Sequence, residues 1–141
     1  MQFLWLAALA VGAPWGGSTA GSAAVGKVGL AGLLAVSAVF GLGGVARLGR
    51  NRTLFPRPRP GSRLVTTGVY RWVRHPLYLS VLAGSAAWVV HWNTPGGWGL
   101  WLAGAVFLDA KARREERWLR EQFPGYAAYA RRVRRLIPGV Y

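Results

Sequence analysis

Apolar residues gather in four segments along the chain. They lie near residues 3–13, 25–48, 77–92 and 98–110. A helix that crosses about 30 Å of hydrocarbon needs about 20 residues, and only the second segment exceeds this length comfortably. A turn signal at residues 91–97 separates the third and fourth segments. They therefore predict a tight helical hairpin, which spans a bilayer only with flanking residues or with local thinning.

The first apolar segment has two interpretations. Ala8-Leu9-Ala10 would suit the small-residue cleavage site of a signal peptide. A signal peptide also requires Lys or Arg in front of its apolar segment. Only Met1 and Gln2 stand there, and neither is basic. We therefore favour a short helix that is retained in the protein.

Two further stretches differ in their pattern from the apolar segments. Residues 55–61 hold three prolines at alternate positions, which removes backbone donors and predicts an extended, semi-rigid linker. After the fourth segment, Leu108, Ala112, Leu119 and Phe123 continue an apolar stripe at helical spacing. We expect this helix to leave the membrane and to run to about Phe123, because Pro124 follows.

Basic residues are distributed unevenly among the connections between these segments. The 18 Lys and Arg face only four Asp and Glu, for a net charge of +14. Between the second and third segments lie Arg47, Arg50, Arg52, Arg57, Arg59, Arg63, Arg71 and Arg74, and Lys111 with eight more Arg follows the fourth. The other two connections carry only Lys27 and His91. Because basic residues mark cytoplasmic loops, four spans with both termini in the cytoplasm are predicted.

The same distribution argues against several other kinds of protein. Clustered arginine can bind nucleic acid, but the positive-inside rule already explains its placement here, so no nucleic-acid partner is expected. There are two His and no Cys, and we expect no metal site. Residues 21–27 imitate a P-loop, but Val28 stands where a magnesium-binding hydroxyl is needed. Gly41, Gly43 and Gly44 predict close helix packing rather than a dinucleotide site.

The region before the third segment is the first candidate site. Pro76 is well placed as the first residue of a helix, with His75 at its cap. The start of a helix offers unpaired N–H groups and a partial positive charge, and Arg74 adds a full one. This combination would hold an anionic group, either of a ligand or of the surrounding lipids.

Glu115 and Glu116 form the second candidate site, in the helix that leaves the membrane. Two carboxylates in a chain with so few acids either pair with neighbouring arginines or bind a cationic ligand. If the third and fourth segments form a hairpin, its cytoplasmic ends bring Arg74 and His75 close to this pair. One pocket would then offer an anion site and a cation site.

Two blocks of residues carry a resemblance to a known family. They are Gly68-x-Tyr70-x-x-x-Arg74-His75-Pro76-x-Tyr78 and Glu115-Glu116-x-x-Leu119-x-x-x-Phe123-x-x-Tyr126-x-x-Tyr129. In this order, on either side of a helical hairpin, they resemble the membrane methyltransferases that include isoprenylcysteine carboxyl methyltransferases and phospholipid N-methyltransferases. The resemblance covers residues 64–138. It departs from many relatives at Arg134, where they have a proline after the valine.

The resemblance implies a cofactor and the residues that hold it. The cofactor would be S-adenosylmethionine (S-adenosyl-L-methionine), bound at the cytoplasmic ends of the last helices. The residues implied to line its pocket are Tyr70, Arg74, His75, Pro76 and Tyr78. Glu115 and Glu116 are implied to hold its polar or cationic groups.

Three residues are expected to serve the reaction itself: Lys111, Glu116 and His75. Family members often carry a substrate-orienting basic residue shortly before the acidic pair, a place that Lys111 occupies, with Arg113 and Arg114 as alternatives. An amine acceptor would have to lose a proton, and His75 or a glutamate would take it. Methyl transfer otherwise needs positioning and desolvation more than strong acids or bases.

Together these features predict an all-α integral membrane bundle of about four transmembrane helices with a cytoplasmic C-terminal helical extension. Residues 1–141 would form one methyltransferase domain, with two helices and the linker in 1–63 and the cofactor-binding hairpin and tail in 64–141. The predicted function is S-adenosylmethionine-dependent methylation of a lipid-like acceptor, a carboxylate or an amine, at the cytoplasmic face. An NADPH-dependent membrane lipid reductase and a non-catalytic basic membrane protein are the alternatives.

Overall fold

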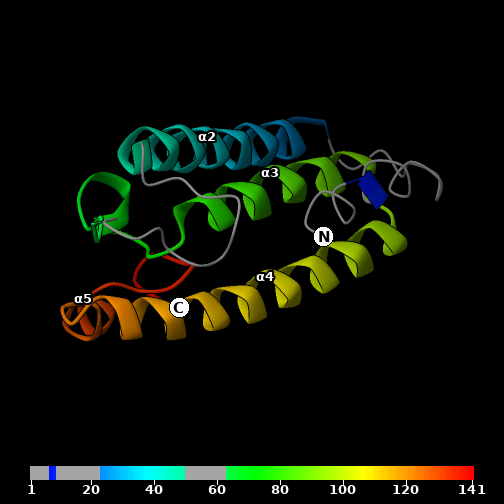
Figure 1. Cartoon of the computed structure of the whole chain (residues 1–141). Coiled ribbons are helices and arrows are strands. Elements are labelled where there is room, and N and C mark those ends of the chain that lie inside the picture. The colour runs from blue at the N-terminus through cyan, green and yellow to red at the C-terminus, as the bar shows by residue number, and fades with distance from the viewer. Residues whose placement is uncertain (1–6, 9–22, 50–62) are drawn as a thin grey trace. The chain divides into compact units, whose positions relative to one another are not determined.

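The structure, a computed structural model, describes residues 7–8, 23–49 and 63–141. In these residues four α-helices, α2 (Ala23–Leu48), α3 (Pro76–Trp92), α4 (Pro95–Gln122) and α5 (Tyr126–Arg132), accompany the short 3-10 helix η3 (Gly68–Arg71) (Figure 1). The described residues form no strand, and a single bridge joins Val73 to Arg134. The all-helical fold class is therefore confirmed. Most of the first apolar segment, including Leu9 and Ala10 of its possible cleavage site, and the linker at 55–61 lie outside the described residues.

The helix boundaries follow the local sequence signals. Pro76 begins α3 as predicted, and α4 ends at Gln122, two residues before Pro124. The turn between them is shorter than expected, since only Asn93 and Thr94 lie outside the helices. Asn93 adopts a positive φ of 45°, and the Thr94 hydroxyl accepts a hydrogen bond from the Gly97 amide at 3.1 Å. Thr94 thus caps α4, and the predicted hairpin connection is confirmed.

The chain divides into two compact units, each built from two stretches of sequence. Unit 1 comprises Met1–Val39 and Ser80–Phe107, and unit 2 comprises Phe40–Leu79 and Leu108–Tyr141. The helices α2, α3 and α4 each contribute residues to both units. The single methyltransferase domain remains a prediction.

Apolar packing dominates the described part of unit 1. Val89 is fully buried, and Trp92, Leu100 and Trp101 pack against it. The Trp101 indole donates to the Leu82 carbonyl at 3.0 Å. The side chains of this core come from the α3–α4 hairpin and are all aliphatic or aromatic.

One helical segment of the described residues is long and apolar enough to cross a membrane. It is Lys27–Leu48, with 22 residues and a mean hydropathy of 2.1. Its outward-facing residues include Val28 and Leu42, which are 76% and 72% exposed. This finding agrees with the second predicted span, whereas the bundle of four spans remains a prediction.

In unit 2 Gly43 and Gly44 of α2 serve close packing, as the sequence predicted. A Cβ atom added to Gly43 would lie 2.7 Å from Cγ1 of Val69, and one added to Gly44 would lie 2.9 Å from Cδ2 of Leu77. Gly68 begins η3 with a φ of +64°, a conformation that favours glycine. These glycines let α2 approach the segment that carries the candidate site.

Candidate functional site

The two predicted sites meet in unit 2 through an ion pair between Arg74 and Glu116. Nη2 and Nε of Arg74 lie 2.9 and 3.0 Å from Oε1 of Glu116. The two side chains are only 9% and 2% exposed. The expected approach of the segment before α3 to the acidic pair on α4 is therefore confirmed.

His75 and Tyr78 extend this contact to both glutamates. Nε2 of His75 lies 3.3 Å from Oε1 of Glu116, and its Nδ1 lies 3.8 Å from Oε2 of Glu115. The His75 ring stacks on the Tyr78 ring, with centroids 5.2 Å apart and planes 3° from parallel. The Tyr78 hydroxyl donates to Glu115 at 2.5 Å. His75, directly before α3, and Tyr78 in its first turn thus present an imidazole and a phenol to the carboxylates of α4.

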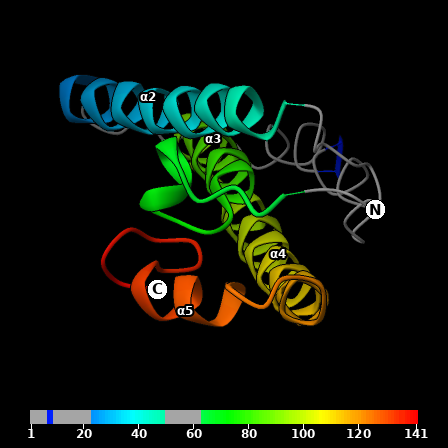
Figure 2. The same cartoon turned by 60° about the vertical axis from the view of Figure 1, so that its left-hand side comes forward.

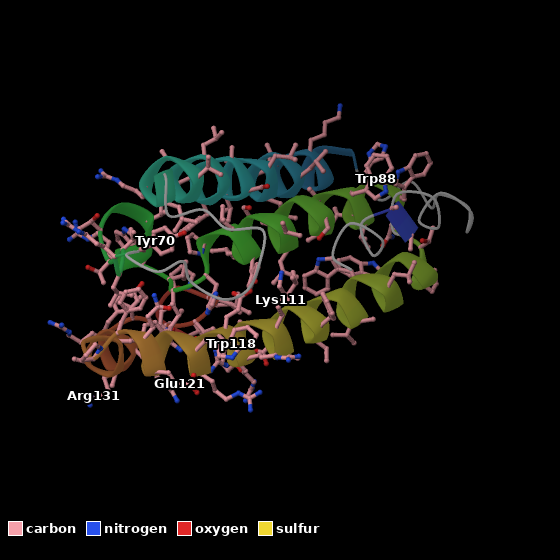
Figure 3. All side chains as sticks on the ribbon, viewed as in Figure 1. Tyr70, Trp88, Lys111, Trp118, Glu121 and Arg131 are labelled. Carbon is pink, nitrogen blue, oxygen red and sulfur yellow. The ribbon has the colours of Figure 1, made fainter. Side chains whose placement is uncertain are left out.

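The other predicted residues lie around this centre. Nζ of Lys111, a residue labelled on α4 in Figure 3, is 3.9 Å from Glu115 and 5.1 Å from the centre of the Tyr78 ring. Tyr70 on η3 is buried, and burial raises its pKa to about 12. Pro76 is fully buried at the start of α3. The predicted site residues therefore gather in one place, while their roles in binding and catalysis remain predictions.

Arg135 belongs to the same cluster, although the sequence analysis did not select it. Its Nε and Nη2 donate to the two carboxylate oxygens of Glu116 at 3.0 and 3.3 Å. Its Nη1 donates to Asp109 at 3.2 Å and to the Tyr141 hydroxyl at 2.7 Å. Arg135 follows Arg134, the position at which the tail departs from many relatives, but nothing in the sequence distinguishes Arg135 from the other arginines of the tail.

Burial and the surrounding donors act on Glu116 in opposite directions. Burial alone would raise its pKa, but hydrogen bonds from His75, Arg135 and Arg74 outweigh burial and lower the pKa to about 2. Glu116 is therefore a buried carboxylate that keeps its negative charge at neutral pH.

The cluster is fixed by the tail that follows α5. Nη1 of Arg74 donates to the carbonyl of Ala130 at 2.8 Å and to that of Val133. The amides of Arg74 and His75 donate to the carbonyls of Arg134 and Arg135 at 2.8 and 3.1 Å. Figure 2 shows this tail, in red, turning back beside α5. Arg74 thus holds the tail as well as Glu116, so most of its donors are used within the protein.

The described residues contain no group of three or more His, Cys, Asp or Glu that could hold a metal ion. The chemistry that the cluster offers is that of paired charges: carboxylates for a cationic group, guanidinium groups for an anionic one, and aromatic rings beside both.

A mainly apolar helical chain with one helix long enough to cross a membrane and a buried cluster of opposite charges fits a membrane-associated protein. The chain belongs to the phospholipid methyltransferase family, whose model matches residues 27–125. The members of this family are membrane methyltransferases that act on lipid-like substrates.

The chain is also similar to the cobalt-zinc-cadmium resistance protein CzcN of Cupriavidus metallidurans. The two are 36% identical over 86 residues, which make up 60% of this chain and 40% of the relative. The chain thus spans well under half of the length of that protein.

Proposed function

We propose that this protein transfers a methyl group from S-adenosylmethionine to a lipid-like acceptor at the cytoplasmic face of a membrane. Family membership supports methyl transfer as the reaction class. The apolar segment Lys27–Leu48 supports a location in a membrane. The observation that carries the proposal is the buried carboxylate of Glu116, held by Arg74, His75 and Arg135.

The residues of this cluster fit the methyl donor by their charges. The donor has an ammonium, a carboxylate and a sulfonium group. Carboxylates and aromatic rings favour the cationic groups, and guanidinium groups favour the carboxylate. The buried hydroxyl of Tyr126 has no hydrogen-bond partner within the described chain, so the cluster also retains unused bonding capacity.

S-adenosylmethionine, when bound, supplies a methyl group that the sulfonium makes electrophilic. In our proposal Glu115 and Glu116 hold its cationic part, and the rings of Tyr70 and Tyr78 face it. Pro76 and His75 fix the start of α3 beside these groups. Arg74 positions Glu116 by its paired contacts and thereby keeps the carboxylate ionised.

The acceptor is proposed to reach the cluster from the lipid phase. Lys111 would orient an acceptor that is a carboxylate, because its ammonium already lies beside Glu115 and Tyr78. An amine acceptor would need a base, and His75 Nδ1, which lies 3.8 Å from Glu115, would take the proton. The basic residues around the site would add attraction to an anionic leaflet, about 1 kcal/mol for each.

Equilibrium binding to the purified protein in detergent tests this function. We expect the wild type to bind S-adenosylmethionine and its demethylated product, and to show no comparable affinity for NADPH. Glu116→Gln should weaken this binding by about tenfold or more, since a charge-assisted contact is lost. Glu121→Gln, a change at an exposed glutamate of the same helix, is the matched control. Tight binding of NADPH alone would indicate a reductase instead.

A further inference from the structure

The two tyrosines on α5 differ in the hydrogen bonding of their hydroxyl groups. Tyr126 and Tyr129 are 1% and 7% exposed, and their rings meet edge to face with centroids 5.9 Å apart. The Tyr129 hydroxyl donates to the carbonyl of Tyr70 at 2.6 Å. The Tyr126 hydroxyl has no hydrogen-bond partner within the described residues. A buried hydroxyl without a partner is uncommon and calls for an explanation.

The surroundings of Tyr126 decide what kind of group its hydroxyl would meet. The charged side chains that act on it are Glu116, Arg74, Arg120 and Arg135. Three guanidinium groups against one carboxylate leave an excess of positive charge, which favours an anionic partner.

The protonation state of Tyr126 decides whether its hydroxyl group donates or accepts a hydrogen bond. Burial, followed by the charge of Glu116, raises the pKa of Tyr126 above its ordinary value. The phenol therefore keeps its proton at neutral pH and is available as a donor.

We propose that the Tyr126 hydroxyl donates a hydrogen bond to an anionic oxygen of a ligand bound at the Glu116 cluster. This oxygen belongs either to the carboxylate of the methyl donor or to the phosphate of a phospholipid acceptor. The inference rests on the proposed function and adds to it a binding residue on α5, beyond the residues near α3 and on α4 for which the sequence predicted a role.

The test removes one oxygen atom from each tyrosine in turn. Tyr126→Phe and Tyr129→Phe are compared with the wild type for binding of S-adenosylhomocysteine, which has the carboxylate, and of 5′-methylthioadenosine, which lacks it. Tyr126→Phe should weaken binding of the first by about tenfold, as expected for a hydrogen bond to a charged group. Its affinity for 5′-methylthioadenosine should remain that of the wild type.

Tyr129→Phe is the matched control on the same helix. Because it removes a bond within the protein, it should lower the midpoint of thermal unfolding while leaving the ratio of the two affinities unchanged. Tyr126→Phe loses no internal bond, so its midpoint should equal or exceed that of the wild type.

A second arm identifies the source of the anionic oxygen. Short-chain phosphatidylethanolamine and the matching diacylglycerol, which lacks the phosphate, are measured with the same variants. A loss confined to the phospholipid in Tyr126→Phe would assign the oxygen to the acceptor's phosphate. Wild-type affinity of Tyr126→Phe for all of these ligands would overturn the inference. Absence of S-adenosylhomocysteine binding to the wild type would instead contradict the proposed function.

Discussion

The two units use opposite means of holding their helices together. In unit 1 the described contacts are apolar, as around Val89, with single hydrogen bonds such as that of Ser37 to the carbonyl of Ser80 at 2.8 Å. The ion pairs of the described residues all lie in unit 2, and the most buried of them centre on Glu116. The same three long helices run through both units, so the difference lies in the side chains and not in the type of fold.

This difference supports the proposal that the function lies in unit 2. Buried charges contribute little net stability, because the loss of hydration offsets much of their attraction. A chain with four acidic residues nevertheless places Asp109, Glu115 and Glu116 in one network. Apolar side chains would have held these helices as well as in unit 1. We therefore attribute the charged cluster to ligand binding.

Removing the carboxylate of Glu116 should have the largest effect on stability. Glu116→Ala would leave Arg74 and Arg135 partly or largely buried without their shared partner, at a cost of about 3 to 5 kcal/mol in the free energy of unfolding. Thermal unfolding in detergent measures this change. Glu121→Ala, at an exposed position of α4, should change the midpoint very little. Equal effects of the two substitutions would show that the cluster adds nothing to the fold.

Lowering the pH should destabilise unit 2, because Glu116 becomes protonated. Because the folded state lowers the pKa of Glu116 from 4.5 to about 2, its contribution is fully present above pH 4.5 and is lost as the pH falls through about 2. The change amounts to about 3 kcal/mol. Unfolding midpoints measured across this range should fall for the wild type. The unfolding midpoint of Glu116→Gln should fall less over the same pH range. An identical dependence on pH in the two proteins would contradict a charged Glu116.

Adding a methyl group to α2 should distinguish the two units. At Gly43 the new Cβ would lie 2.7 Å from Val69, so Gly43→Ala should cost about 1 to 3 kcal/mol of stability. At Gly32, in unit 1, a new Cβ would have no atom within 4 Å among the described residues outside its own stretch of helix, and Gly32→Ala should be neutral or slightly stabilising. Chemical or thermal unfolding of the two variants measures the difference. A destabilised Gly32→Ala with an unaffected Gly43→Ala would reverse the expected order.

The smallest effect is expected for the hydrogen bond of unit 1. Ser37→Ala removes the donor to the Ser80 carbonyl, and side-chain hydrogen bonds between membrane helices average about 0.6 kcal/mol. A shift in the unfolding midpoint of a few degrees at most should result. A loss as large as that of Glu116→Ala would mean that unit 1 also depends on polar contacts.

Much of this architecture could be predicted from the sequence. Helical periodicity and the signals at Pro76 and Pro124 predicted the start of α3 and the end of α4, and the expected hairpin correctly brought Arg74 to Glu116. Arg135 could not be selected, because the tail holds several arginines and only the path of the chain after α5 brings one of them to Glu116. The unpartnered hydroxyl of Tyr126 likewise depends on packing that periodicity does not describe.

The most direct test of the central claim is transfer of a labelled methyl group. Membranes that contain the wild type are incubated with methyl-labelled S-adenosylmethionine, and the label in the extracted lipid is measured beside membranes with Glu116→Gln or Glu121→Gln. We predict label in lipid for the wild type and Glu121→Gln, and a loss of at least about tenfold for Glu116→Gln at equal protein level. Equal labelling by Glu116→Gln and the wild type would contradict the assignment of this cluster as the active site.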